Sequence, residues 1–430
     1  MKNKKLDSFM AVLCVVLLAV LVGSVFITGR AQVMAGKRVG SIAEISVPAV
    51  PEVTTDRAYG VVSAKEWSEH YPDIYASYMA NVDNTGHGGK RISYVEDDPD
   101  IQTLYQGMGF AFDYTEAIGH NFTLDDIAKT ERPHKLANCL TCKTPDFTAM
   151  VNAMGTDAYS QDFESVFGMV SEPISCYNCH GNTPGTMVIT HDYMADAMGD
   201  EVAANRVSGS VISCAQCHIE YYFDPATKAT RTPYDSLDNL DPDSILAFYN
   251  KMGFVDFTNE NTGVGMIKVQ HPEFETFYGE GSVHKGMYSC ADCHMGVAYD
   301  KSGDPYANHL LTSPLANEDL LRNTCSMCHN GKDYPEVPDL VKAIQTEITG
   351  REKAVSAKLV EINTKLAAAI EAGSLPGDVI AGIKNLDRAA QFYWDFVYVE
   401  NSEGAHNSEL SRQCLDKAEA LADQALALLG

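Results

Sequence analysis

Five pairs of cysteines in this chain are spaced Cys-x-x-Cys, and four of the pairs are followed directly by a histidine. In a c-type heme site the two thiols form thioethers to the porphyrin, and the next side chain supplies an axial ligand to the iron. The first pair ends in a lysine instead, which predicts one iron that differs from the rest. The motifs are Cys139/Cys142/Lys143, Cys176/Cys179/His180, Cys214/Cys217/His218, Cys290/Cys293/His294 and Cys325/Cys328/His329.

Two simpler interpretations of these cysteines fit less well. The motifs use ten of the twelve cysteines and leave only Cys14 and Cys414, and the paired cysteines are too close in sequence for a disulfide framework. Structural zinc sites also use Cys-x-x-Cys pairs. Zinc does not account for a histidine that follows the second cysteine four times, so five covalent hemes are predicted.

The histidine count bears on which irons are open to substrate. An iron with two histidine ligands is six-coordinate, so it passes electrons and binds nothing further. The chain has 13 histidines, and those outside the motifs suffice for four distal ligands and one catalytic imidazole. A neutral Lys143 amine can bind iron once burial and the metal lower its pKa, which leaves the other face of that heme free. The alternative is that Lys143 lies on the surface and that His134 or another histidine is the ligand.

The charge of the chain limits its partners. The formal net charge is −26 over 430 residues, which argues against nucleic acid and against an anionic membrane surface. The same charge would steer a basic redox partner toward the protein. A small anionic substrate would need a local positive pocket.

The N-terminus predicts export. Lys2, Lys4 and Lys5 precede an uncharged, largely apolar run over residues 9–28. This run is longer than a usual signal-peptide core and just long enough to span a bilayer, so residues 1–30 are a cleaved signal peptide or a membrane anchor. Either one places the rest of the protein in the periplasm or on the outer face of the cytoplasmic membrane. Residues 31–58 are predicted to be a linker.

Two regions follow the linker. Residues 59–335 hold all five motifs in short segments with many turn residues, because hemes themselves can supply much of the apolar core. In residues 336–430 apolar side chains recur at intervals of three and four, which predicts helices over about 337–372, 378–399 and 408–429. Gly350 is a candidate break in the first. The predicted fold is mainly α, a multiheme cytochrome c fold with closely packed hemes and long C-terminal helices that pack on the heme region or dimerise.

The order of one lysine motif and four histidine motifs resembles the pentaheme cytochrome c nitrite reductases, which form ammonia. Residues 214–222 (CAQCHIEYY) and 268–273 (KVQHPE) are similar to segments of the same family, and the likeness extends from about Ala64 to the C-terminus. It implies six-electron reduction of nitrite to ammonium at the lysine-ligated heme. The four bis-histidine hemes would carry and store electrons.

The resemblance also implies an active site. Tyr221 and His271 match the family's tyrosine and histidine, and Arg132 ends a segment similar to the one that holds its arginine. Arg132 and His271 would hold the anion and donate hydrogen bonds to a leaving oxygen, and Tyr221 would donate a proton or stabilise an intermediate. One departure concerns Arg132, since only six residues separate it from Cys139, fewer than is typical of the family.

Further ligands are implied by position. A calcium ion would be bound by the Glu220 carboxylate, the Gln270 amide oxygen and the backbone carbonyls of Tyr221 and Lys268, all hard oxygen ligands. The implied distal ligands are His309 for the heme at His180, His120 for that at His218, His406 for that at His294 and His284 for that at His329. The other histidines are expected to lie on the surface or in hydrogen bonds: His70, His87, His134 and His191.

Finally, the family implies a homodimer and a membrane quinol-oxidising multiheme cytochrome as electron donor. Two other functions stay open. One is a pure electron-transfer cytochrome in which a histidine closes every iron, although the two matching segments would then have no role. The other keeps the open iron but changes the substrate to sulfite, hydroxylamine or nitric oxide, and these compounds could also be side substrates of a nitrite reductase.

Overall fold

The computed structural model describes residues 42, 45, 49–83, 91–133 and 135–430. The predicted N-terminal signal or anchor, Cys14, His87 and His134 lie outside these residues. The described chain is mainly helical, as predicted, with three small two-stranded sheets. None of its helices is both long and apolar enough to cross a bilayer.

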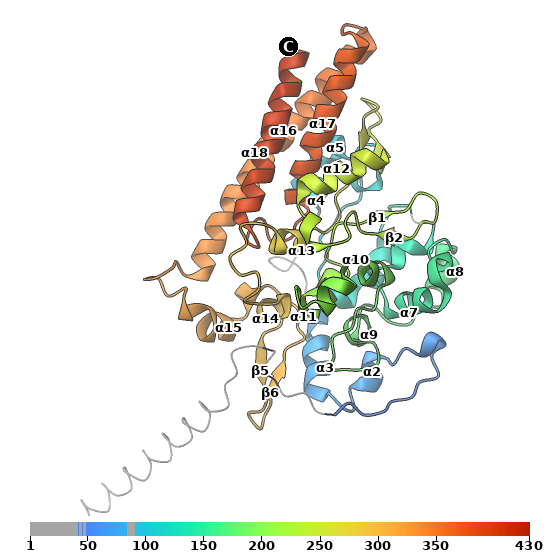
Figure 1. Cartoon of the computed structure of the whole chain (residues 1–430), viewed down its shortest axis with the longest axis vertical. Helices are drawn as coiled ribbons and strands as arrows, with labels where there is room; N and C mark the ends of the chain where they lie inside the picture. The colour runs from blue at the N-terminus through green and yellow to red at the C-terminus, as the bar shows by residue number, and fades with distance from the viewer. Residues whose placement is uncertain (1–41, 43–44, 46–48, 84–90, 134) are drawn as a thin grey trace, which may run out of the picture.

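Short helices and turns make up the part of the chain that carries the cysteine motifs, and three long helices form its C-terminal end (Figure 1). The helices are α2 (Ala64–Trp67), α3 (Pro72–Met79), α4 (Tyr94–Asp97), α5 (Ile101–Leu104), α6 (Thr123–Lys129), α7 (Pro145–Met154), α8 (Phe163–Phe167), α9 (Cys176–His180), α10 (Asp192–Ala203), α11 (Gly209–Ala215), α12 (Pro242–Met252), α13 (Glu273–Tyr278), α14 (Cys290–His294), α15 (Glu318–Asn323), α16 (Val337–Ala372), α17 (Gly377–Tyr398) and α18 (Ser408–Leu429). The strands are β1 (Tyr222–Phe223), β2 (Thr230–Arg231), β3 (Phe257–Thr258), β4 (Gly265–Met266), β5 (Val297–Tyr299) and β6 (Pro305–Ala307).

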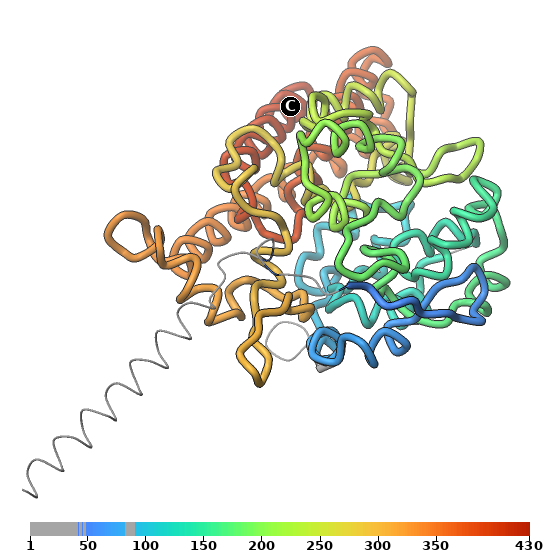
Figure 2. Tube along the Cα trace, turned by 60° about the horizontal axis from the view of Figure 1, so that its bottom comes forward, coloured from blue at the N-terminus to red at the C-terminus, as the bar shows by residue number. Residues whose placement is uncertain are grey.

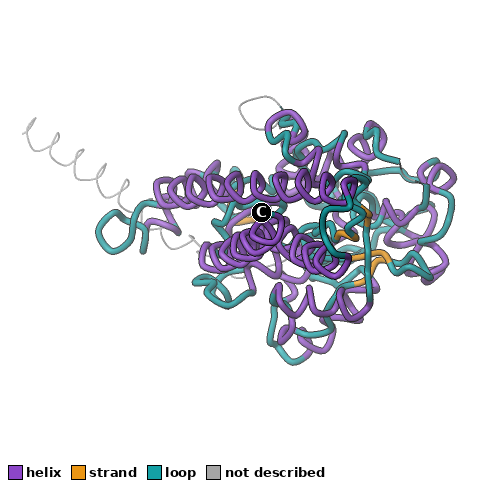
Figure 3. The backbone as a smooth tube through the Cα atoms, turned by 90° about the horizontal axis from the view of Figure 1, so that it is seen from above, coloured by secondary structure: helices purple, strands orange, loops and turns teal. Residues whose placement is uncertain are grey.

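The three C-terminal helices agree closely with the sequence periodicity. They lie side by side (Figure 3), and Gly373 ends α16 in the left-handed conformation that glycine adopts readily. The predicted break at Gly350 is wrong, because α16 continues through it without interruption. An interior glycine costs a helix only about 1 kcal/mol relative to alanine. The fully buried Ile348 and Leu359 on either side hold the helix against its neighbours.

This helical bundle shares one hydrophobic core with the motif-bearing half of the chain. Hydrogen bonds cross the same boundary. The buried Gln391 side chain of α17 donates to the Leu104 carbonyl at 2.9 Å, and the Tyr398 hydroxyl donates to Asp98 at 3.2 Å. The earliest described segments lie at the opposite side of the molecule from this bundle (Figure 2). Dimerisation through the helices stays a prediction.

A second, smaller core surrounds the first cysteine motif. Ala137 and Leu140 are fully buried against Phe147 of α7 and Phe163 of α8. Thr144 caps α7 by accepting a hydrogen bond from the Asp146 backbone N–H at 3.2 Å. The turn at residues 139–143, called the lysine turn below, is therefore fixed by apolar packing before it and by a capped helix after it.

Candidate active site

Each histidine that follows a cysteine pair faces the ring of a second histidine from another part of the chain. Metal–imidazole bonds are about 2 Å long, so two rings on opposite sides of one ion have centroids about 6 Å apart. The observed spacings fit one iron between each of the four pairs that the family resemblance implies, and for His218 the ring of His271, at 6.3 Å, meets the same distance as His120. The centroid distances are 6.5 Å for His120 and His218, 6.3 Å for His180 and His309, 5.8 Å for His294 and His406, and 6.2 Å for His284 and His329.

The outer ring nitrogens of five of these eight histidines also suit metal ligands. A ligating histidine generally donates its second N–H to a carbonyl or carboxylate, which fixes its tautomer and orientation. Here the Nδ1 atoms contact the Thr186 carbonyl from His180 (2.9 Å), the Ala307 carbonyl from His309 (2.9 Å), the Thr312 carbonyl from His294 (3.1 Å), the Pro335 carbonyl from His329 (2.9 Å) and Glu400 from His406 (2.6 Å). The Nε2 atoms stay available to a metal, so the residues fit six-coordinate hemes.

The cysteines of different motifs lie close together. All described cysteines are free thiols. A hydrogen bond from Cys217 lowers the pKa of the Cys142 thiol, and one from Cys290 lowers the pKa of the Cys214 thiol. The third motif therefore adjoins both the first and the fourth.

Two further thiols connect the remaining motifs. Burial and the neighbouring Cys214 raise the pKa of Cys179 to about 12. Burial and Cys325 likewise raise the pKa of Cys293 to about 12. The first, third, fourth and fifth motifs thus follow one another in space, and the second adjoins the third.

Cys328 of the fifth motif is less covered by the chain than the other motif cysteines. It is exposed, whereas the other nine motif cysteines are partly buried. The reason lies in the fold, because this motif follows the short helix α15 at the edge of the molecule (Figure 1), and the neighbouring Met327 is 65% exposed. The chain therefore covers Cys328 on few sides, and a heme held there would have an edge open to solvent. The thioether at Cys328 stays a prediction.

Lys143 is held in place through its backbone. Its N–H donates to the Leu140 carbonyl at 3.0 Å, and its own carbonyl accepts from the Thr123 hydroxyl at 2.7 Å. The half-buried Lys143 side chain lies near two imidazoles, since its charge adds to burial in lowering the pKa values of His120 and His271 to about 4. The Lys143 charge is therefore close enough to act on both imidazoles.

His271 presents an unsatisfied ring nitrogen. Its backbone N–H donates to the Ile219 carbonyl at 3.2 Å, and its ring lies 6.3 Å from that of His218. Its Nδ1 atom is buried and has no hydrogen-bond partner among the described residues. A buried polar atom without a partner is rare and fits a position that contacts a ligand.

Arg132 and Tyr221 lie near the lysine turn. The guanidinium Nε donates to the Thr130 hydroxyl at 2.9 Å, and the guanidinium carbon lies 4.2 Å from the centre of the Phe110 ring. Burial raises the pKa of the Cys139 thiol, and the nearby Arg132 charge opposes that effect. Burial also raises the pKa of Tyr221 well above its ordinary value, and Cys142 and Cys139 add to the increase. The Tyr221 hydroxyl therefore stays protonated and can donate.

The side chains proposed to bind calcium form one hydrogen-bonded group. The fully buried Glu220 carboxylate accepts from the Gln270 backbone N–H at 2.6 Å and from the Tyr249 hydroxyl at 2.7 Å. The Gln270 amide nitrogen donates to the Lys268 carbonyl at 2.8 Å. In the described part of the chain no three His, Cys, Asp or Glu side chains are grouped to hold a metal. A cation here would need the amide and carbonyl oxygens as well.

Electrostatics favour a cation beside Glu220. Burial, with Glu275 and Asp256 as nearby negative charges, raises the pKa of Glu220 well above its ordinary value. Burial raises the pKa of Glu275 to about 8, and one of its buried oxygens has no partner among the described residues. Positive charge at this position would relieve the repulsion between these carboxylates.

One component of the site has no signal in the sequence. The ammonium group of Lys268, expected to contribute only its carbonyl, is buried 3.2 Å from Asp395 and 4.9 Å from the centre of the Tyr105 ring. It also lies 5.4 Å from the Phe110 ring that contacts Arg132. Asp395 is 127 residues away in the chain, so spacing could not reveal this pair.

The remaining described histidines are His70, which is exposed, and His191, which is buried in hydrogen bonds. Both agree with the sequence analysis, which expected them on the surface or in hydrogen bonds.

Comparison with known proteins gives the family. The cytochrome c552 family model matches residues 63–430. The solved catalytic subunit of the cytochrome c nitrite reductase from Desulfovibrio desulfuricans is 24% identical, with 87% of each chain covered and a TM-score of 0.75. Weaker likenesses, both 19% identical with a TM-score of 0.38, involve the outer cell wall cytochrome OcwA (75% of this chain, 49% of that one) and an undecaheme S-layer cytochrome from Carboxydothermus ferrireducens (72% and 41%).

The likeness to the Desulfovibrio structure confirms the predicted multiheme fold with long C-terminal helices. The match of the family model over nearly the whole described chain confirms the resemblance seen in the motifs. The chain belongs to the cytochrome c552 family, that of the pentaheme, ammonia-forming cytochrome c nitrite reductases.

Proposed function

We propose that this protein reduces nitrite to ammonium with six electrons at a c-type heme ligated by Lys143, fed by four bis-histidine hemes. The observation that carries the proposal is electrostatic proximity to the lysine turn: the charge of Lys143 acts on His271, that of Arg132 acts on Cys139, and Cys142 acts on Tyr221. The buried Nδ1 of His271, which has no partner among the described residues, supports it further. When bound there, the heme supplies an open coordination position and the electrons.

The side chains around the lysine turn have distinct tasks. The Arg132 guanidinium, oriented by Thr130 and Phe110, pairs with the negative charge of nitrite and offers fixed N–H donors to its oxygens. His271 donates a hydrogen bond to an oxygen as that oxygen leaves as water. The Tyr221 hydroxyl, which burial keeps protonated, donates a hydrogen bond or a proton. The buried Lys268 ammonium lies near the same Phe110 ring but is paired with Asp395, so the charge that draws an anion into a chain of net charge −26 is that of Arg132.

Electron delivery follows the contacts between motifs. Electrons reach the lysine turn from the motif at Cys214, whose second cysteine, Cys217, lies within hydrogen-bonding reach of Cys142. The motif at Cys290 adjoins the same motif through Cys214, and the motif at Cys325 adjoins Cys293. The second motif adjoins the third through Cys179 and supplies a branch of this route.

One calcium ion is proposed at Glu220, Gln270 and the carbonyls of Tyr221 and Lys268. The catalytic subunit of the Desulfovibrio enzyme has two calcium sites. Because Tyr221 belongs to both groups, the ion would fix the tyrosine and add positive charge beside the bound nitrite. The family likeness also supports a periplasmic or membrane-anchored homodimer that receives electrons from a membrane quinol-oxidising multiheme cytochrome.

Turnover with a reduced viologen dye tests the proposal. Nitrite consumption and ammonium release are followed together in the wild type and in His271→Ala, with the exposed His70→Ala as matched control. We expect ammonium from the wild type and the control, and a loss of about 10²-fold or more in kcat for His271→Ala, the usual contribution of a positioned proton donor. Dye oxidation that does not depend on nitrite would identify an electron carrier with every iron closed.

A further inference from the structure

A buried hydrogen-bond network joins three of the five heme-binding turns through the same position of each motif. The second residue between the two cysteines is Thr141 in the first motif, Asn178 in the second and Gln216 in the third, and all three are buried. The fifth motif has the exposed Met327 at this position. The first three turns therefore meet at one point in the interior, which the fifth does not share.

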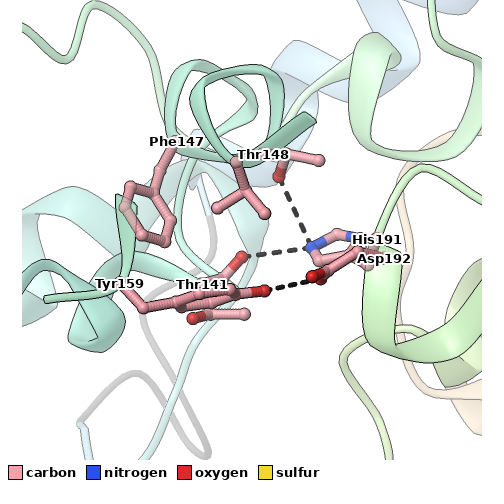
Figure 4. Close-up of a pocket in the computed structure, with 7 residues that line it drawn as sticks. Thr141, Phe147, Thr148, Tyr159, His191 and Asp192 are labelled. Atoms are coloured by element: carbon pink, nitrogen blue, oxygen red, sulfur yellow. Dashed lines mark hydrogen bonds between the residues drawn. The ribbon is translucent and has the colours of Figure 1, made fainter. Parts of the chain in front are cut away.

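His191 lies at this meeting point and is only 4% exposed. Its Nε2 atom lies 3.1 Å from the Thr141 carbonyl and 3.4 Å from the Thr148 hydroxyl, and its backbone N–H donates to the Gln216 side-chain oxygen at 2.9 Å. Since a carbonyl oxygen can only accept, Nε2 is the protonated nitrogen. Figure 4 shows the imidazole reaching across from the start of α10 to the lysine turn and α7.

Thr190 and Gln216 extend the network to the second motif. The Thr190 hydroxyl donates to the Asn178 carbonyl at 2.6 Å, and the Gln216 amide nitrogen donates to the same carbonyl at 3.3 Å. The Asn178 amide nitrogen in turn donates to the Thr148 hydroxyl at 3.2 Å. The network therefore closes on itself, from the lysine turn through His191 and Gln216 to Asn178 and back through Thr148.

Such a network resists distortion. Leaving one buried donor or acceptor unsatisfied costs about 1–3 kcal/mol, so the low-energy arrangement of the three turns is the one that satisfies all partners. The first helical turn of α10 adds a second connection, because the Tyr193 hydroxyl donates to the Gln216 carbonyl and lies 3.7 Å from the Cys142 sulfur. Thiol positions in the first and third motifs are thus tied to the same helix.

We propose that His191 is a positioning residue that sets the lysine turn relative to the second and third heme-binding turns. It thereby sets the rate at which electrons reach the heme held at Lys143. The inference rests on the proposed function, because it gives these three turns an electron-transfer task. His191 itself contacts neither substrate nor iron, since its ring is enclosed by Thr141, Thr148, Thr190 and Gln216.

The test compares two substitutions in the holoprotein, each first checked for five bound hemes by absorbance. His191→Phe keeps a ring of similar size but removes both nitrogens. His191→Gln keeps an amide donor near the position of Nε2. We expect kcat to fall by about tenfold to 10²-fold in His191→Phe, as for an ångström-scale misplacement, with KM for nitrite unchanged and most of the rate restored in His191→Gln. His70→Gln, at an exposed histidine, is the matched control and should equal the wild type.

A second readout does not depend on nitrite turnover. In the oxidised protein, electron paramagnetic resonance reports the magnetic interaction between the heme at the lysine turn and its neighbours, which varies with their distance and orientation. We expect His191→Phe to change this interaction and His191→Gln to keep it. If the wild type fails to reduce nitrite but the spectra change as described, the proposed function is wrong and the positioning role stands.

Two results would overturn the inference. One is a His191→Phe protein with the kcat and spectrum of the wild type. The other is an equal loss in the phenylalanine and glutamine variants, which would mean that the donor at Nε2 is irrelevant. If His191→Phe does not retain five hemes, Thr148→Val replaces it, because valine keeps the shape and removes only the hydroxyl that contacts His191 and Asn178. Thr148→Val should then change kcat and the spectrum in the direction expected for His191→Phe, but by a smaller amount. A Thr148→Val protein with the kcat and spectrum of the wild type would contradict the positioning role.

Discussion

The Nδ1 atom of His406 lies 2.6 Å from a carboxylate oxygen of Glu400, and the Glu400 residue is only 2% exposed. The facing ring, His294, instead contacts the neutral carbonyl of Thr312. His218 also has a carboxylate nearby, but its Nδ1 lies 3.6 Å from Glu273. A hydrogen-bonded carboxylate makes an imidazole a stronger electron donor to its metal, which stabilises the oxidised iron. Glu400 therefore distinguishes the heme expected between His294 and His406.

Replacement of Glu400 by glutamine should raise the reduction potential of one bis-histidine heme. The amide keeps the shape and a hydrogen bond but removes the negative charge that stabilises the oxidised form. Redox titration followed by absorbance measures the potentials, and Glu371→Gln at an exposed position of α16 is the control. Unchanged potentials, or a decrease, would show that Glu400 does not act on this heme.

Arg132 should affect nitrite binding in a way that depends on its shape as well as its charge. Arg132→Lys keeps the positive charge but loses the planar fork of donors that contacts Thr130 and the Phe110 ring. We expect an increase of about tenfold in KM for nitrite in Arg132→Lys, and a larger increase with reduced kcat in Arg132→Ala. A lysine variant with wild-type constants would place the anion elsewhere.

Calcium should be required for full activity, and its binding should depend on Glu220. Glu220→Gln removes the charge of the carboxylate at the centre of the group, so calcium content per chain, measured by elemental analysis, should fall. Prolonged chelation of the wild type should reduce turnover, and added Ca²⁺ should restore it. Glu280→Gln, at an exposed residue after α13, should keep its calcium. Equal calcium content in the wild type and Glu220→Gln would rule out this site.

The stability of the C-terminal bundle should depend on pH through Asp387. This α17 carboxylate is fully buried, neither oxygen has a partner among the described residues, and burial raises its pKa from 3.8 to about 7. Because the pKa of Asp387 is higher in the folded than in the unfolded state, its contribution to the free energy of unfolding is largest below about pH 4. That contribution falls as the pH rises toward 7. Above pH 7 the cost is constant and amounts to a few kcal/mol, at about 1.4 kcal/mol per pKa unit.

Asp387→Asn removes that titration. Its gain in free energy of unfolding over the wild type, measured by urea denaturation, should be clearly larger at pH 8 than at pH 5. Asp378→Asn, in the exposed first turn of the same helix, should show no such difference. A gain that is equal at both pH values would mean that Asp387 is not the titrating group.

Local patterns account for the parts of this protein that the sequence predicts well. The cysteine motifs are contiguous, and the apolar spacing of α16, α17 and α18 is itself the packing surface, so both are visible without a structure. The break expected at Gly350 was wrong because packing on either side outweighs one glycine. Periodicity reports local preference, whereas the continuity of a helix also depends on what covers it.

The sequence alone could not predict contacts between segments that are far apart in the chain. Residue spacing alone could not select His309 as the partner of His180, and that pairing came from the family resemblance. Lys268 and Asp395 form their buried ion pair across 127 residues, and nothing near either residue indicates it. His191 was expected only to be on the surface or hydrogen-bonded. Its contact with Thr141 depends on the folding of α10 against the lysine turn.

Exposure is a further property that a motif does not report. Cys328 has the same spacing as the second cysteine of every other motif, yet it is exposed and they are partly buried. The difference arises from the position of the fifth motif at the edge of the fold, after α15, which its own residues do not reveal.

The most direct test of nitrite reduction at the lysine turn is the stoichiometry of turnover by the purified holoprotein. Oxidised viologen, consumed nitrite and released ammonium are measured in one sealed reaction. The proposed function requires six electrons and one ammonium for each nitrite, without accumulation of an intermediate. Nitrite loss with fewer electrons and no ammonium would contradict it, because the site would then release a partly reduced nitrogen compound.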